Sequence, residues 1–130
     1  MDAVVPGRVL IAPGGLHMSV VKRDGAMFVE CRAGEKVNGH CPSVDYLFDS
    51  VAKLSNIQSL GIILTGMGSD GAKGLLAMRN QGAETIGQDQ KTCVVYGMPA
   101  VAQNIGAVQN QMPLSDMPKR IYEWYNRKNR

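Results

Sequence analysis

The hydrophobic residues of this chain form short continuous runs, separated by stretches in which they recur every three or four positions. The runs at residues 8–12, 60–65 and 84–87 predict buried strands, and residues 93–96 are a fourth apolar stretch. Helices are predicted to open at Ser43, to run from about Asp70 to Gln81, to end near Ile105, and to be capped by Ser115. Two of these helices carry apolar faces, formed by Val44, Leu47, Phe48, Val51 and Leu54 and by Met117, Ile121, Trp124 and Tyr125.

A hairpin is predicted near the N-terminus. Two strand-like runs, residues 19–22 and 26–30, flank Arg23-Asp24-Gly25, and an Asp-Gly pair between such runs is a strong hairpin signal. Elsewhere, strands alternate with helices and read as continuous apolar runs, which is typical of a parallel sheet covered on both faces. We therefore predict a doubly wound α/β fold with a mostly parallel sheet and an antiparallel hairpin near its start.

Composition narrows the functional classes. The 130 residues suffice for one domain, and no apolar run approaches the roughly 20 residues of a membrane span. The net charge of +3 lies in the tail from Lys119, where five basic residues and one acid give +4 and leave −1 elsewhere. This distribution argues against a nucleic-acid surface. Three scattered cysteines indicate neither a disulfide framework nor a metal site, so we expect a cytoplasmic protein without a cofactor.

Two polar residues follow predicted strands at positions where α/β proteins place their sites. His17 comes after the run at 8–12 and Asp70 after the run at 60–65, so both are expected at the carboxyl edge of the sheet. A histidine held by a carboxylate can serve as the base in nucleophilic acyl transfer. Each residue alone has a plainer interpretation, as a loop histidine and as an acid at a helix start. His40 lies in a polar loop and reads as a surface residue.

The glycine-rich turn offers a rival interpretation. Residues 66–71 match the G-x-G-x-x-G pattern, follow a strand, open a helix and precede an acid, Asp89, by about 20 residues. Against a dinucleotide site, Asp70 would place a negative charge where the pyrophosphate must bind. The chain is also too short for both mononucleotide-binding halves.

Four blocks in the same order resemble the CheB-type protein-glutamate methylesterases, over roughly residues 6–107. Ile11-Ala12-Pro13-Gly14-x-x-His17-Met18 is similar to the histidine segment of that family. Cys41-Pro42-Ser43-Val44-Asp45-Tyr46-Leu47-Phe48-Asp49-Ser50 resembles its Pro-Ser-Val-Asp helix, and Leu64-Thr65-Gly66-Met67-Gly68-Ser69-Asp70-Gly71 resembles its aspartate loop. Gly87-Gln88-Asp89, Val94-Val95-Tyr96-Gly97-Met98-Pro99 and Ala102 match the following block.

The resemblance implies a serine esterase on a doubly wound α/β sheet. Its members remove methyl groups from glutamate side chains of methyl-accepting chemotaxis receptors, and can deamidate receptor glutamines. By position, His17 would be the general base, Asp70 the orienting carboxylate, and Met67 the residue whose backbone N–H helps to bind the oxyanion. No cofactor or metal is implied, and the partners would be the receptors.

The chain departs from the family pattern at the nucleophile. The family serine lies in a Gly-x-Ser-Thr-Gly-Gly turn upstream of the histidine, whereas none of the 16 residues before His17 is a serine. Ser19 lies in the predicted hairpin, and Ser69 has no precedent in the family as a nucleophile. We therefore expect residues 1–130 to be a single partial catalytic domain that is inactive alone. The alternative is a catalytically silent module that binds a receptor or another partner.

Two structural expectations follow from this assignment. His17 and Asp70 should face each other, with a carboxylate oxygen about 2.6–3.2 Å from an imidazole nitrogen. Without the serine-bearing segment, residues 8–12 should also form an exposed strand edge, and such edges pair with other chains. We expect self-association or a partner that supplies the missing segment. The alternative is a monomer in which residues 1–7 and the C-terminal helix cover the edge.

Overall fold

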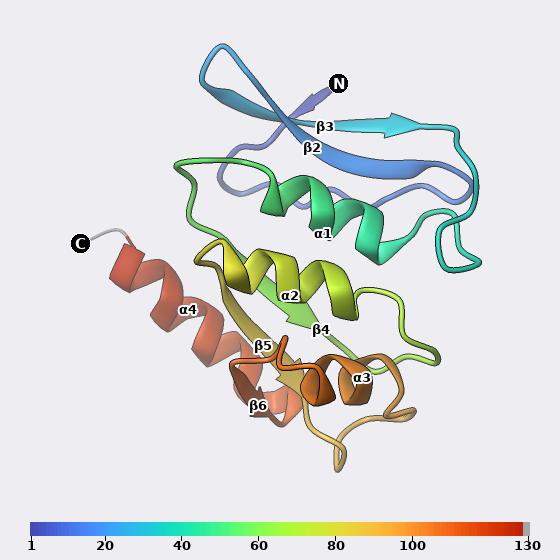
Figure 1. The fold of residues 1–130 in the computed structure, drawn as a ribbon. Coiled ribbons are helices and arrows are strands. Elements are labelled where there is room, and N and C mark those ends of the chain that lie inside the picture. The colour runs from blue at the N-terminus through green and yellow to red at the C-terminus, as the bar shows by residue number, and fades with distance from the viewer. Residues whose placement is uncertain (129–130) are drawn as a thin grey trace.

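The computed structural model describes residues 1–128, which form two three-stranded sheets and four α-helices (Figure 1). An antiparallel sheet has the order β1-β3-β2, and a parallel sheet has the order β4-β5-β6. The elements are β1 (Asp2–Ala3), β2 (His17–Arg23), β3 (Ala26–Arg32), α1 (Val44–Ala52), β4 (Leu60–Ile63), α2 (Ala72–Asn80), β5 (Glu84–Gln88), α3 (Met98–Asn104), β6 (Asn110–Met112), the 3-10 turn η1 (Leu114–Asp116) and α4 (Met117–Lys128).

The parallel sheet is covered on both faces, as the apolar runs predict. Ile63 and Gly87 are neighbours across β4 and β5 and face the side of α2, where the main hydrophobic cluster lies. Ile86 points to the opposite side, because side chains alternate along a strand, and it is fully buried. Helix α4 runs beside β5 and is tied to it by Arg127, which donates to both oxygens of Glu84 at 2.9 and 2.8 Å. The predicted fold class is confirmed.

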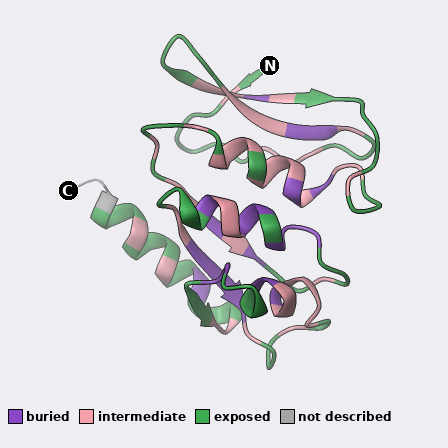
Figure 2. Ribbon diagram, viewed as in Figure 1, coloured by how far each residue is buried: buried purple, intermediate pink, exposed green. Residues whose placement is uncertain are grey.

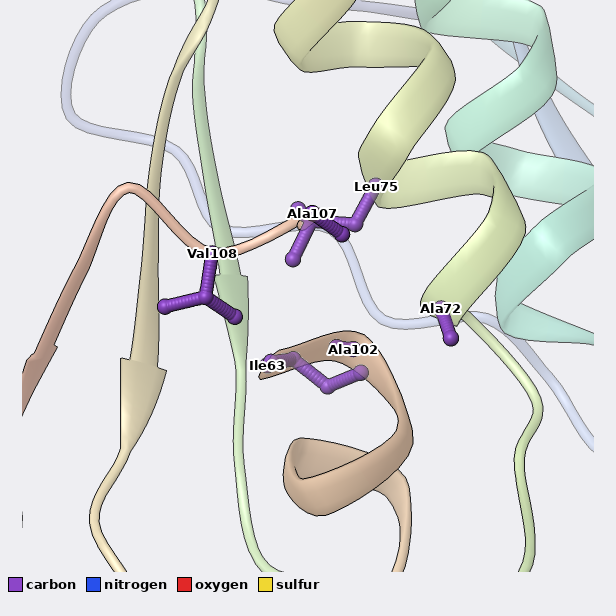
Figure 3. Close-up of a cluster of buried hydrophobic side chains, with 6 residues drawn as sticks. All are labelled: Ile63, Ala72, Leu75, Ala102, Ala107 and Val108. Atoms are coloured by element: carbon purple, nitrogen blue, oxygen red, sulfur yellow. The ribbon is translucent and has the colours of Figure 1, made fainter. Parts of the chain in front are cut away.

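The core joins α2, α3 and the parallel sheet, and buried residues concentrate in α2, β4 and β5 (Figure 2). Its central cluster is drawn in Figure 3 and contains Ile63, Ala72, Leu75, Ala102, Ala107 and Val108. Helix α1 approaches α2 closely at Gly74, where a Cβ would lie 2.6 Å from Cβ of Phe48 and 2.9 Å from an Asp45 oxygen. This glycine therefore brings the start of α1 next to the loop that precedes α2.

The predicted hairpin is confirmed and is longer than its apolar runs. β2 and β3 pair from His17 opposite Arg32 to Arg23 opposite Ala26, and the turn consists of Asp24 and Gly25. Both turn residues have positive φ, 52° and 80°, which matches the right-handed twist of the strands. The hairpin makes His17 the first residue of a strand.

One expected strand is absent from the described residues, and the fourth apolar stretch forms no strand either. Residues 8–12 are irregular, with Val9 86% and Ile11 85% exposed, since no strand among residues 1–128 pairs with them. Of residues 93–96, only Tyr96 forms an isolated bridge, to Gly66. The third parallel strand is instead β6, whose polar sequence gave no apolar signal. Ser115 lies within η1, so the last helix begins one residue later than a Ser115 cap would place it.

No helix among the described residues has the length and apolar character needed to cross a membrane.

Candidate catalytic site

Asp70 lies beyond the carboxyl end of β4, in the loop that leads into α2, and is 4% exposed. Its carboxylate meets the first turn of α1. The backbone N–H of Val44 donates to Oδ2 at 2.7 Å, and that of Asp45 donates to Oδ1 at 3.2 Å. A helix N-terminus presents free N–H groups and positive potential, so it stabilises an anion there. The aspartate predicted from the glycine-rich turn is thus anchored on a helix far from it in sequence.

Two side chains complete the hydrogen bonding of this carboxylate. The Ser43 hydroxyl and the Asn38 amide donate to Oδ1 at 2.8 and 2.9 Å. Burial by itself raises the pKa of Asp70, but the hydrogen bonds from Asn38, the Val44 N–H, Ser43 and the Asp45 N–H outweigh it and lower the pKa below its ordinary value. Asp70 is therefore ionised at neutral pH.

Asn38 links Asp70 to a second buried acid. Its amide nitrogen also donates to Oδ2 of Asp45 at 2.7 Å, while Oδ1 of Asp45 accepts the Gly74 N–H at 2.7 Å. Asn38 adopts a left-handed backbone conformation with φ 54°, which asparagine tolerates better than most residues. The loop before α1, the start of α1 and the start of α2 are thus joined by one polar network.

His17 is 1% exposed, and both ring nitrogens have backbone partners. Nε2 lies 2.7 Å from the Glu35 carbonyl oxygen, and Nδ1 accepts the Ser43 N–H at 3.3 Å. A carbonyl only accepts and an amide N–H only donates, so these contacts assign the ring proton to Nε2. The ring also stacks on Tyr46, with centroids 4.3 Å apart and an interplanar angle of 16°.

The expected direct hydrogen bond between His17 and Asp70 was wrong. Among residues 1–128 none joins them, and Ser43 lies between them, with its N–H on the imidazole and its hydroxyl on the carboxylate. The reason is that both ring nitrogens and Oδ1 of Asp70 are already engaged by groups of α1 and the loop before it. His17 also begins a strand of the antiparallel sheet, so only Asp70 lies at the carboxyl edge of the parallel sheet.

Met67 is exposed at the tip of the glycine-rich turn. Gly66 fixes the turn, because its N–H donates to the Val95 carbonyl at 3.1 Å and its carbonyl accepts the Met98 N–H at 2.8 Å. Gly97 packs so closely that a Cβ there would lie 2.6 Å from the Gly66 carbonyl oxygen. Within the described part of the chain the Met67 N–H has no hydrogen-bond partner, so it can donate to a ligand oxygen.

The structure argues against a dinucleotide site, because the acid that the pattern requires, Asp89, is used in a local turn. Asp89 is part of an exposed turn, in which its Oδ1 accepts the N–H of Thr92 at 3.0 Å and the hydroxyl of Thr92 at 2.7 Å. The residues that sequence analysis missed are Asn38 and Tyr46, and Ser43 was recognised only as a helix cap. Ser43 and Tyr46 lie in the block that resembles the Pro-Ser-Val-Asp helix, and that resemblance was the one indication in the sequence that they matter to the site.

Comparison with known proteins gives a consistent result. The family model for CheB methylesterase matches residues 1–121. The protein-glutamate methylesterase/protein-glutamine glutaminase 2 of Syntrophomonas wolfei is 58% identical over 125 residues, which cover 96% of this chain and 37% of that relative. A relative of the same name from Hahella chejuensis is 56% identical over 121 residues, covering 92% of this chain and 33% of the relative. The chain thus spans about a third of the length of these curated relatives.

A solved structure shares the fold. The crystal structure of the Thermotoga maritima CheB methylesterase catalytic domain matches with a TM-score of 0.89 and 34% sequence identity. The match covers 95% of this chain and 66% of that catalytic domain. Since the family model covers nearly the whole chain and the fold agrees, the chain belongs to the CheB methylesterase family.

Proposed function

We propose that this chain carries the base and the orienting carboxylate of a cytoplasmic methylesterase that hydrolyses glutamate methyl esters on chemotaxis receptors. Deamidation of receptor glutamines, which the relatives' names also state, is proposed as a second reaction of the same site. Residues 1–130 would form a single, partial catalytic domain. The observation that carries the proposal is the buried cluster in which Ser43 joins the His17 imidazole to the ionised Asp70 carboxylate.

The roles follow from the hydrogen bonding of each group. A general base needs a lone pair, and Nδ1 of His17 has one, shared only with a long 3.3 Å bond from the Ser43 N–H. Its proton would come from the nucleophilic serine as the serine oxygen attacks the ester carbonyl, and would then pass to the departing methanol oxygen. The anionic Asp70 nearby would stabilise the imidazolium. The free Met67 N–H would donate to the oxyanion.

Burial of the ring sets a further requirement. His17 is closed in by the loop that carries Glu35 and by Tyr46, so a nucleophile cannot reach it in the conformation described. For Nδ1 to take the serine proton, its 3.3 Å bond from the Ser43 N–H would have to break and the ring would have to turn that nitrogen toward the nucleophile. The nucleophile itself would come from the Gly-x-Ser-Thr-Gly-Gly turn of the family, which residues 1–130 do not contain. The alternative function is a silent module that binds receptors through the same fold.

Methanol release from methylated receptor membranes tests the proposal. The 130-residue chain alone should release no methanol above background, because a triad without its serine retains at best a small residual effect. A fusion of this chain to the serine-bearing remainder of the Syntrophomonas wolfei relative should be active, and a serine-directed inhibitor should abolish that activity. An inactive but folded fusion would favour the silent module. Inhibitor-sensitive release by the chain alone would refute the assignment of the nucleophile.

We also propose that this chain associates with a second copy through the face where β4 has no neighbour. Strand β4 is the edge of the parallel sheet in the described residues. Beside it is a mostly apolar groove of about 300 Å³, lined by Val4, Arg8, Leu10, Met18, Val20, Val29, Leu47, Phe48, Val51, Ser59, Leu60 and Met78. An unpaired edge next to an apolar groove favours strand addition from another chain. Strand β1 pairs with β3 and not with β4, and the residues that line the groove include Val4 from residues 1–7 but none from α4.

Sedimentation equilibrium at micromolar concentration tests this association. The chain should show an average mass that rises with concentration above that of a 14.0 kDa monomer. The double variant Val9→Lys/Ile11→Lys should shift the distribution toward monomer, because it adds charge to the exposed apolar segment beside the groove. Val94→Lys is the matched control, since Val94 is 90% exposed on a different loop. A single monomer at all concentrations would refute the association.

A further inference from the structure

We infer that Ser43 is a positioning residue, which connects the Asp70 carboxylate to the His17 imidazole and holds the ring in the tautomer with its proton on Nε2. The inference deepens the proposed function and rests on it for its catalytic meaning. The contacts that carry it are the Ser43 hydroxyl on Oδ1 of Asp70 at 2.8 Å and the Ser43 N–H on Nδ1 of His17 at 3.3 Å.

Capping of α1 does not require either of these two contacts. As the N-cap of α1, Ser43 needs only an oxygen lone pair, which accepts the Tyr46 N–H at 3.4 Å. Both of its hydrogen-bond donors are used elsewhere, one on the aspartate and one on the histidine. Ser43 is itself buried, so water does not compete for these donors. In the described part of the chain, Ser43 is the one residue that hydrogen-bonds to both His17 and Asp70.

The backbone of Ser43 explains how one residue reaches both partners. Its φ of −108° and ψ of 138° are extended, so its N–H points away from the helix and toward the ring, while its side chain points into the first turn. Tyr46, one turn later, stacks on the face of the same imidazole. The first turn of α1 therefore restrains the ring both at its edge and on its face.

The tautomer follows from which groups are already occupied. The Ser43 hydroxyl takes up acceptor capacity of Oδ1 on Asp70, and the Ser43 N–H requires a lone pair on Nδ1. Without the hydroxyl, Oδ1 of Asp70 loses one of its three donors, while the backbone N–H of residue 43 and the Glu35 carbonyl continue to favour the proton on Nε2. Against these two groups, the competing tautomer, with its proton on Nδ1, can then donate to the anionic carboxylate, and a hydrogen bond to a charged group is the stronger kind. Removing the hydroxyl should therefore shift the ring proton toward Nδ1.

The test is nitrogen-15 NMR of the histidine rings in the full 130-residue chain, compared with Ser43→Gly and Ser43→Thr. Glycine is a good N-cap that lacks the hydroxyl, whereas threonine keeps a hydroxyl donor and serves as the conservative rescue. In the unsubstituted chain, His17 should show a protonated Nε2 and an unprotonated Nδ1. In Ser43→Gly the two nitrogen shifts should converge or exchange, and Ser43→Thr should resemble the unsubstituted chain. His40, the other histidine, is exposed and serves as an internal reference.

The outcomes separate positioning from capping. Circular dichroism should show the same helix content in the variants, and if Ser43→Gly does not fold, Ser43→Ala replaces it with the same expected shift. Unchanged His17 nitrogens in the folded Gly or Ala variant would overturn the inference, as would an equal change in Ser43→Thr. Because the readout is the tautomer and not turnover, an inactive fusion enzyme would refute the proposed function without altering this result.

Discussion

His17→Ala is expected to lower kcat/KM for methanol release by at least about 10³-fold in the active fusion. The imidazole is the one group in the cluster that can both accept the serine proton and return it to methanol. Asp70 is already hydrogen-bonded by four donors and has a lowered pKa, so it is too weak a base to replace it. Initial rates of methanol release over a range of receptor concentrations provide the measurement.

The matched control is His40→Ala. His40 is the other histidine of the chain and is exposed in the loop before α1, so its removal should leave kcat/KM within about twofold. His17 is buried, so circular dichroism and urea unfolding must first show that His17→Ala is folded. His17→Gln provides a second variant of similar polarity. If folded variants of His17 keep more than a tenth of the activity, the ring is not the general base.

The strands and turns predicted best were those that can be recognised from residues adjacent in the sequence. The hairpin depends on Asp24 and Gly25, which adopt the positive φ values that the turn requires. Strands β4 and β5 were recognised because a strand buried on both faces must be apolar throughout. Strand β6 was missed because Asn110 and Gln111 are exposed and polar, so its pairing with β5 leaves no trace in hydrophobicity. Residues 8–12 have the pattern of a strand but lack a neighbour, and a strand exists only through pairing.

In the site too, individual residues could be recognised from the sequence, but the contacts between distant segments could not. The glycine-rich turn and its aspartate could be recognised from the sequence, as could the serine that caps α1. That the aspartate binds the first turn of α1 could not, because it depends on how closely α1 approaches α2 at Gly74. The bridge through Ser43 follows from that approach. A direct contact between His17 and Asp70 was expected because sequence analysis identified the two residues without the group that lies between them.

Asp70→Asn is expected to reduce the free energy of unfolding at pH 7 by about 3 kcal/mol. The substitution keeps the shape of the side chain but replaces one acceptor oxygen with an N–H donor. At least one donor among Ser43, Val44 and Asn38, whose bonds to the carboxylate are buried or partly buried, then faces another donor. The remaining bonds also lose the strength that the negative charge gives them. Asp24→Asn is the matched control: its side chain is exposed in a turn that asparagine tolerates, so its change should stay within about 0.5 kcal/mol.

The same variant predicts how the stability depends on pH. The pKa of Asp70 is lower in the folded chain than its ordinary value of 3.8, so its ionised form stabilises the fold fully at pH values well above 3.8. As the pH falls below that value and then through the folded pKa, this contribution is lost. The difference in unfolding free energy between the unsubstituted chain and Asp70→Asn should therefore be constant near neutrality and shrink below about pH 4. Glu84, with a lowered pKa, and Asp49, with a raised one, are present in both chains and cancel in the difference. Urea unfolding at pH 7, 5 and 3.5 measures it, and a difference that grows on acidification would show that the donors around Asp70 do not favour its charged form.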